Sequence, residues 1–153
     1  MDKKEMIDNL SDLVKVDIDA VHAYGQVIKH IDITSVREQL VNFQGDHERH
    51  IKDLSRVIRN LGGEPPEFSR DFKGYVLQGF AALRSMTGDE GALKALKSGE
   101  EFTNKRYHEA RSWDLPADII SIIESNYEDE QRHLNYVNQA INDKVWETAA
   151  AKK

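Results

Sequence analysis

Four long stretches of the chain carry apolar residues at alternating steps of three and four, the spacing that places them along one face of an α-helix. Two of the stretches open on a Ser/Thr-x-x-Glu sequence, at Ser35–Glu38 and Thr87–Glu90. This spacing predicts a capping box, in which two side chains satisfy the free amide groups at a helix start. We therefore predict helices at about residues 3–31, 35–61, 87–110 and 116–146.

The connections between these stretches differ in length. Short turns follow the first and third stretches, which predicts that each pair packs as an antiparallel hairpin. The second stretch stops at Gly62-Gly63 and Pro65-Pro66, because glycine favours a helix end and proline cannot continue a helix. The long connection that follows carries apolar residues at helical spacing, which predict a short amphipathic helix: Phe72, Tyr75, Val76, Phe80 and Leu83.

Such a connection also fixes the direction of the third helix. A helix of about 28 residues is about 42 Å long, so the third helix can run parallel to the second only if a crossover carries the chain back along the bundle. The fold class predicted is therefore all-α, an antiparallel four-helix bundle with a long crossover that carries a short extra helix.

Two related hexapeptides lie on the second and fourth predicted helices. They read Asp46-His47-Glu48-Arg49-His50-Ile51 and Asp129-Glu130-Gln131-Arg132-His133-Leu134, and a shift of 83 residues superimposes them. The same shift carries Asp17 onto Glu100 and Tyr24 onto Tyr107. Each half thus has an acid, a tyrosine seven residues later and an i, i+3 pair. This pattern predicts an internal duplication of helical hairpins, an arrangement that can build a metal site inside a bundle.

The helical phase places eight polar side chains on the inward faces. At two positions the apolar stripe decides between neighbouring acids: it favours Asp17 over Asp19 and Glu100 over Glu101. The predicted inward set is Asp17, Tyr24, His47, His50, Glu100, Tyr107, Glu130 and His133. The predicted outward set comprises three solvated histidines and four surface salt-bridge partners: His22, His30, His108, Asp46, Arg49, Asp129 and Arg132.

Three inward carboxylates require compensation, because a buried carboxylate without a partner is costly. A pair of divalent cations would supply it, and carboxylate and imidazole ligands suit iron, manganese and zinc. Tyr24 and Tyr107 would donate hydrogen bonds to ligands or to bound oxygen species. A metal-free polar network, with pairs such as His50 and Glu130, is the alternative interpretation of the same residues.

Composition narrows the classes of function. The chain has 153 residues, 31% charged and 39% hydrophobic, which is typical of one charged-surface helical domain, predicted at residues 1–148 with a frayed tail at 149–153. There is no cysteine, so thiolate chemistry and disulfides are excluded. The net charge of −6 and the absence of a basic stripe argue against nucleic acid. The apolar runs are short, so neither a membrane segment nor a secretory signal is expected, and the predicted location is cytoplasmic.

The residues of the duplicated motif resemble the ferritin-like family of di-iron carboxylate proteins, which includes bacterioferritin and rubrerythrin, and within it the small bacterial ferritin-like bundles. The resemblance covers residues from about 5 to 145. That family has an acid on the first and third helices and Glu-x-x-His on the second and fourth. Glu130-x-x-His133 and Glu100 match this pattern, and Asp17 is a shorter version of the first acid.

His47 departs from the family pattern, which has a Glu that bridges two metals at this position. A neutral imidazole cannot bridge two cations as a carboxylate does. The resemblance therefore implies a weaker or differently loaded site in the half that contains Asp17, His47 and His50.

The resemblance implies a di-metal oxidoreductase, ferroxidase-like or peroxidase-like, or an iron-handling protein. Two iron ions, or manganese or zinc, would bind with Glu130 as the bridge and Asp17 and Glu100 as terminal ligands, and dioxygen or peroxide would be the oxidant. One alternative is a structural or stress-related helical module without a catalytic metal. Another is a mononuclear zinc or manganese site at Glu100, Glu130 and His133. The chain ends soon after the fourth helix, so we expect a monomer or homodimer rather than a storage shell.

Overall fold

The computed structural model describes residues 1–69 and 79–147, and in these ranges the chain is helical with no strand. The four long helices are α1 (Lys3–His30), α2 (Thr34–Asn60), α3 (Gly88–Ala110) and α4 (Ala117–Asn142), with a short 3₁₀ helix, η1 (Ala81–Ser85), before α3. The predicted all-α four-helix bundle is confirmed, and the predicted helix bounds agree with the observed ones to within a few residues.

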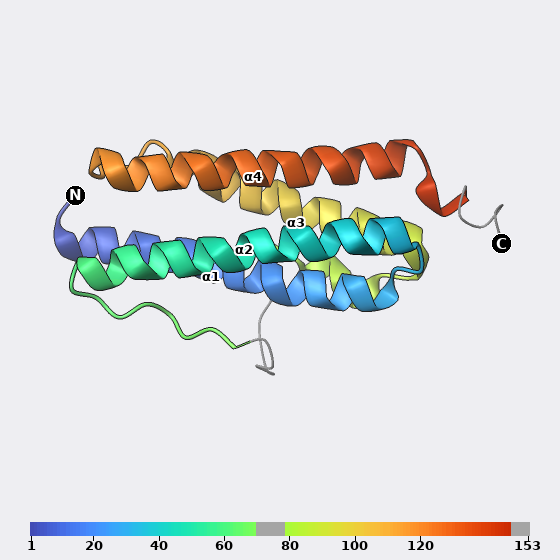
Figure 1. Cartoon of the computed structure of the whole chain (residues 1–153), viewed down its shortest axis with the longest axis horizontal. Helices are drawn as coiled ribbons and strands as arrows, with labels where there is room; N and C mark the ends of the chain where they lie inside the picture. The colour runs from blue at the N-terminus through green and yellow to red at the C-terminus, as the bar shows by residue number, and fades with distance from the viewer. Residues whose placement is uncertain (70–78, 148–153) are drawn as a thin grey trace.

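The four helices form two antiparallel hairpins packed side by side (Figure 1). The chain turns tightly between α1 and α2 and again between α3 and α4, whereas a long segment joins α2 to α3. As a result α2 and α3 run in the same direction, as the predicted crossover requires. No helix of the described part is long and apolar enough to cross a membrane.

The helix starts differ from the prediction. The capping box present in the structure is at α1, where the Asp2 carboxylate accepts a hydrogen bond from the Glu5 amide at 2.8 Å. The predicted box at Ser35 is wrong, because α2 begins one residue earlier and has Ile33 at its cap. Thr87 is the cap residue of α3, as predicted, but its side chain makes no capping hydrogen bond.

The crossover enters α3 through a tight packing contact. Phe80 is fully buried, and a Cβ atom added to Gly99 would lie 2.0 Å from the Phe80 ring, so the ring packs directly on the helix backbone. Leu83 is also buried. The predicted amphipathic helix is observed here only as the 3₁₀ turn η1, and its other predicted members, Phe72, Tyr75 and Val76, lie outside the described residues.

The fourth helix is shorter than predicted. It ends at Asn142, and Lys144 adopts a left-handed conformation with φ 48° that breaks the helix. Val145 and Trp146 then turn back to pack against the core, which explains why they looked helical by spacing. The predicted frayed tail at 149–153 lies outside the described residues.

One face of α1 is more covered than its sequence suggests. Asp19, predicted to be outward, is only 6% exposed, and His22, predicted to be solvated, is half-buried. For His22 the physical reason is the segment after α2, which places Phe68 edge-on to the His22 ring at 6.2 Å between centroids. The other two histidines predicted to be outward, His30 and His108, are exposed.

The buried side chains form two apolar clusters with a polar layer between them. One cluster surrounds Tyr24, Phe43 and Phe80, and the other surrounds Tyr107 and the first half of α1. The inward polar residues occupy the layer between the clusters, near the middle of each helix. This arrangement shields the polar layer from water at both ends of the bundle.

Candidate metal centre

The structure brings the six predicted metal ligands together in the bundle interior, each of them 0% exposed. Each of the four helices contributes: Asp17 from α1, His47 and His50 from α2, Glu100 from α3, Glu130 and His133 from α4. The choice of Glu100 over Glu101 by helical phase is confirmed, because Glu101 is exposed.

The first of two groups of potential ligands surrounds Asp17. The Oδ1 atom of Asp17 lies 2.8 Å from His47 Nδ1 and 3.0 Å from His50 Nδ1. The Oε1 atom of Glu130 lies 3.2 Å and 3.4 Å from the same two nitrogens. The ligand atoms of these four residues all lie within 4.8 Å of one another, close enough to coordinate one ion.

The second group surrounds Glu100. Its Oε1 atom lies 3.3 Å from His47 Nε2 and its Oε2 atom lies 3.8 Å from His133 Nδ1. Glu130 Oε2 lies 3.5 Å from the same His133 nitrogen. His47, Glu100, Glu130 and His133 again have ligand atoms within 4.8 Å of one another.

His47 and Glu130 belong to both groups. Glu130 turns Oε1 to the first group and Oε2 to the second, while His47 turns Nδ1 to the first and Nε2 to the second. The sequence interpretation placed His47 only in the half with Asp17. The structure corrects this, because the His47 ring lies between the two groups.

The two predicted tyrosines connect the duplicated halves crosswise. Tyr24 donates a hydrogen bond to Glu100 Oε1 at 2.7 Å, and Tyr107 donates one to Asp17 Oδ2. Burial, together with the charges of these carboxylates, raises the pKa of both hydroxyls well above the ordinary value. Both tyrosines are therefore protonated donors that orient the acid of the opposite half.

Two aspartates predicted to be surface residues contact the ligand histidines. Asp46 Oδ2 lies 2.9 Å from His133 Nε2, and Asp129 Oδ2 lies 2.9 Å from His50 Nε2. The aspartates are only 16% and 17% exposed. The prediction that they are plain surface residues is therefore wrong, and the difference matters for function. A carboxylate that bonds the second ring nitrogen of a metal-binding histidine fixes the tautomer and the orientation of the ring.

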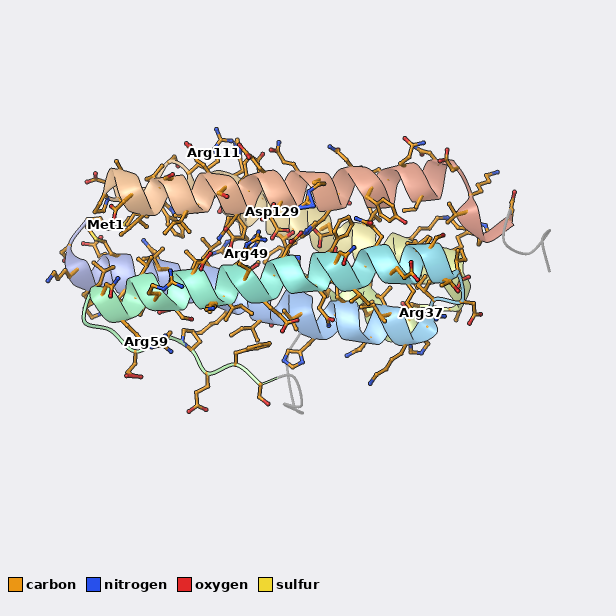
Figure 2. The ribbon with its side chains drawn as sticks, in the orientation of Figure 1. Met1, Arg37, Arg49, Arg59, Arg111 and Asp129 are labelled. Atoms are coloured by element: carbon orange, nitrogen blue, oxygen red, sulfur yellow. The ribbon has the colours of Figure 1, made fainter. Side chains whose placement is uncertain are left out.

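Arg49 and Arg132 form the outer side of this arrangement. Arg132 bonds Asp46 and Asp129, each at 2.9 Å, and Arg49 pairs with both aspartates as well. Figure 2 shows Arg49 and Asp129 between α2 and α4. The salt bridges were predicted; the hydrogen bonds to the histidines were missed. The repeat could have revealed them, because the shift of 83 residues also relates Asp46 to Asp129.

Thr103 is a further polar contact that sequence reasoning did not assign. Its hydroxyl lies 3.2 Å from Glu100 Oε2 and 3.1 Å from Glu130 Oε2, so it stands between the two acids of the second group. Ala20 occupies the repeat-equivalent position. No motif could therefore single out Thr103, and the contact makes the two halves unequal.

The charges of the centre oppose the effect of burial. Burial alone would lower the pKa of His47, but the nearby carboxylates, first among them Glu130, outweigh it and raise that pKa to about 10. The pKa values of His50 and His133 are also raised by their carboxylate neighbours. Glu130 responds in the opposite sense, because the charge of His47 holds its pKa well below the ordinary value against the effect of burial.

The residues present fit a cation. Glu130 Oε1 and His133 Nδ1 are fully buried and have no hydrogen-bond partner, although both point into the polar layer. A buried carboxylate oxygen and a buried imidazole nitrogen that have charged neighbours but no hydrogen bond are costly for the metal-free chain. They are also the atoms that a divalent cation would use as ligands.

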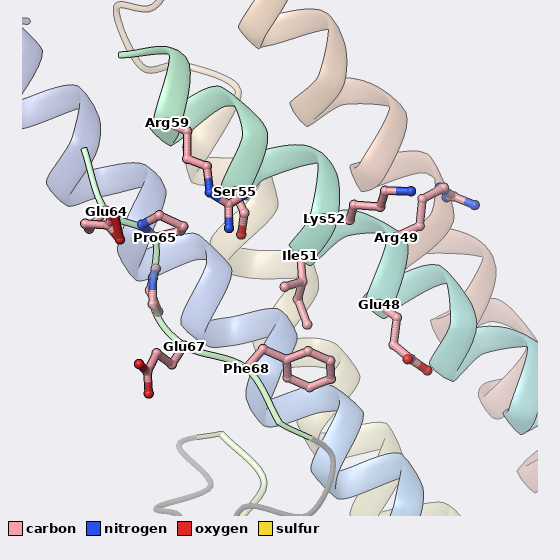
Figure 3. A pocket seen from close by; sticks show the side chains of 11 residues that line it. Glu48, Arg49, Ile51, Lys52, Ser55, Arg59, Glu64, Pro65, Glu67 and Phe68 are labelled. Atoms are coloured by element: carbon pink, nitrogen blue, oxygen red, sulfur yellow. The ribbon is translucent and has the colours of Figure 1, made fainter. Parts of the chain in front are cut away.

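A surface pocket lies apart from this centre, between α2 and the segment that follows it (Figure 3). Charged residues dominate its lining: Glu48, Arg49, Lys52, Arg59, Glu64 and Glu67, with Ile51, Ser55, Pro65, Pro66 and Phe68. None of the eight predicted inward residues lines the pocket. The candidate chemistry is therefore in the bundle interior and not in this pocket.

Comparison with solved structures agrees with the bundle architecture. A conserved hypothetical protein from Mycobacterium tuberculosis has a TM-score of 0.78 at 12% identity, over 92% of this chain and 94% of that one. A ferritin-like, diiron-carboxylate protein from Bacillus anthracis has a TM-score of 0.72 at 17% identity, over 92% and 99%. A dodecameric thioferritin, the bacterioferritin-related protein of Bacteroides fragilis, has a TM-score of 0.76 at 17% identity, over 100% and 94%.

Comparison with curated proteins gives no match. A family model described as a domain of unknown function, DUF2383, matches residues 5–112. This match covers more than half of the chain and includes nearly all of α1 and the whole of α2 and α3. The buried clusters of histidines and carboxylates agree with the resemblance that the sequence motifs indicated. The chain belongs to the DUF2383 family and has the ferritin-like fold.

Proposed function

We propose that the protein binds ferrous iron in the polar layer and transfers its electrons to dioxygen or peroxide. The observation that carries the proposal is the pair of overlapping four-residue groups that share His47 and Glu130. Their mixed nitrogen and oxygen donors suit iron, and manganese or zinc can occupy the same donors. A diiron-carboxylate protein with the same fold supports iron as the first choice.

The roles of the residues follow from their contacts. Glu130 would hold an ion in each group, and Asp17 and Glu100 would each hold an ion in one group; each of these two acids accepts a hydrogen bond from a tyrosine of the opposite half. Asp46 and Asp129 orient the histidines from outside. Two bound ferrous ions would supply the two electrons that, with two protons, reduce dioxygen to hydrogen peroxide or hydrogen peroxide to two water molecules.

The proposal is tested by titrating the metal-free protein with ferrous iron without oxygen, counting the bound metal, and then admitting air. We expect tight binding followed by an absorbance change as the iron is oxidised. Glu100→Gln removes a ligand of the second group and should lower the amount of iron bound, whereas Glu101→Gln, the same change at the exposed neighbour, should leave it unaltered. No bound iron in the unmodified protein, or equal loss in both variants, would contradict the proposal.

A structural helical module is the second candidate, and one observation favours it. Asp17 already pairs with His47 and His50 at 2.8 Å and 3.0 Å, so part of the polar layer is satisfied without a metal. This candidate predicts that chelators leave thermal stability unchanged. A mononuclear zinc or manganese site at Glu100, Glu130 and His133 lies between the two, and metal counting separates it from the iron proposal.

A further inference from the structure

His47 is the one imidazole of the centre that faces both groups. Its Nδ1 atom lies 2.8 Å from Asp17 Oδ1, and its Nε2 atom lies 3.3 Å from Glu100 Oε1. Each of the other two histidines instead uses its second nitrogen to contact an outer aspartate. The position of His47 therefore makes it a potential ligand in either group.

The chemistry of the ring limits what this position can do. A neutral imidazole has one nitrogen with a free lone pair, while the other nitrogen carries the proton. Glu130, the other shared residue, is not limited in this way, because a carboxylate has one oxygen for each group. When both groups hold an ion, Glu130 can serve both but His47 can serve only one. The other ion keeps three protein ligands instead of four.

The charge of the centre is about equally balanced with one or with two divalent ions, so charge alone does not set the loading and the shared ring does. The two groups together contain three carboxylates, Asp17, Glu100 and Glu130, all fully buried. With one divalent ion these groups keep one net negative charge, and with two ions they carry one net positive charge. An unbalanced buried charge is costly. The outer aspartates do not correct the balance, because Arg49 and Arg132 already pair with them.

We propose that the two groups compete for His47, so that a cation bound in either group weakens the binding of a second cation in the other. The inference rests on the proposed metal-binding function and concerns how the centre is loaded. The second ion should bind at least about tenfold more weakly than the first, the lower end of the loss seen when a residue that supports a ligand is removed. In this account the weaker binding of the second ion comes from the shared ring and not from a group that is weak by itself.

The test uses two half-centre variants and cobalt(II), whose visible absorption reports its ligands. Asp17→Asn with His50→Gln disables the first group and leaves the second complete. Glu100→Gln with His133→Gln does the reverse. Competition for His47 predicts that each variant binds one cobalt ion about as tightly as the unmodified protein binds its first, because the remaining group no longer shares the ring. Glu101→Gln with His108→Gln is the surface control.

A third variant, His47→Glu, replaces the shared imidazole by a group with two oxygens. It should raise the affinity for the second ion at least about tenfold relative to the unmodified protein.

Thermal unfolding establishes that each variant is folded. Tight binding by one half-centre variant and weak binding by the other would overturn the inference in favour of two independent, unequal sites. Two equal sites in the unmodified protein would also overturn it. No cobalt binding by the unmodified protein would instead contradict the proposed function.

Discussion

At the scale of single residues, the centre is organised by crossed contacts between the two halves of the repeat. Tyr24 and Tyr107 each donate a hydrogen bond to the acid of the opposite half. Asp46 and Asp129 each contact the second residue of the i, i+3 pair in the opposite half, His133 and His50 respectively. Any change at one of these residues therefore acts on a ligand that another hairpin supplies. The outer aspartates are the sharpest test, because they are only partly buried and do not belong to the ligand groups themselves.

Asp129→Ala removes the carboxylate from His50 Nε2 and leaves the ring free to change tautomer. In the Glu100→Gln, His133→Gln variant, which keeps only the Asp17 group, we expect this change to lower metal affinity by about ten- to a hundredfold, the usual loss when such a partner is removed. The accompanying loss of stability should be about 1–3 kcal/mol, because the change leaves the buried Nε2 atom of His50 without its hydrogen-bond partner. Competition with a chelator measures the affinity. Asp12→Ala, an exposed aspartate of α1, is the control, and equal affinity in both variants would contradict the role of Asp129.

The raised histidine pKa values predict how pH acts on the metal-free protein. A group whose pKa is higher in the folded than in the unfolded chain stabilises the fold when protonated. For His47 this stabilisation is complete below its unfolded value of 6.5 and is lost as pH rises through about 10. The melting temperature of the metal-free protein should therefore fall as pH rises through this window. His47→Gln should flatten the fall, and an unchanged profile would contradict the assignment.

At the scale of elements, much of the fold follows from apolar spacing alone. The four helices and the crossover could be predicted because each helix keeps one continuous apolar stripe, and helical phase correctly separated Glu100 from Glu101. The start of α2 could not be predicted in this way. No side chain caps this helix, and Arg37 donates a hydrogen bond to the Ile31 carbonyl at 2.6 Å. The half-burial of His22 depends on Phe68, in a segment distant in sequence, which local spacing cannot indicate.

The same division applies to the candidate site. Its six proposed ligands could be placed together from the repeat, since equivalent positions of two hairpins meet at the centre of a bundle. The hydrogen bonds of the outer aspartates and the position of Thr103 depend on the distance between α2 and α4 or between α3 and α4. Packing sets that distance, and the apolar spacing within a single helix does not indicate it.

The contact between Phe80 and Gly99 gives a prediction about how the crossover is held. Gly99→Ala places a methyl group where the Phe80 ring lies and should destabilise the protein by about 1–3 kcal/mol, the usual cost of overpacking. Gly45→Ala is the matched control, because its added methyl group meets nothing within 4 Å. Removing a glycine from a helix interior should stabilise the protein by about 0.5–1 kcal/mol. Urea unfolding measures both, and a loss of stability at both positions would contradict this account.

At the scale of the whole molecule, two apolar clusters enclose one polar layer, so the stability of the bundle depends on how that layer is satisfied. A cation that binds only the folded chain stabilises it by about 2.7 kcal/mol at a concentration one hundred times its dissociation constant. We expect manganese or ferrous iron to raise the melting temperature, and chelation to reverse the shift. Asp17→Asn with Glu100→Gln should abolish the shift. A melting temperature that is indifferent to metal in the unmodified protein would favour the structural module.

The central claim is that ligands from both hairpins meet around a cation inside the bundle. The most direct measurement is anomalous diffraction at the iron edge from a crystal soaked with ferrous iron in the absence of oxygen. The account predicts an anomalous peak in the polar layer, within coordination distance of Glu130 and His47. Peaks only at surface carboxylates, or none in the interior at full soaking, would contradict it.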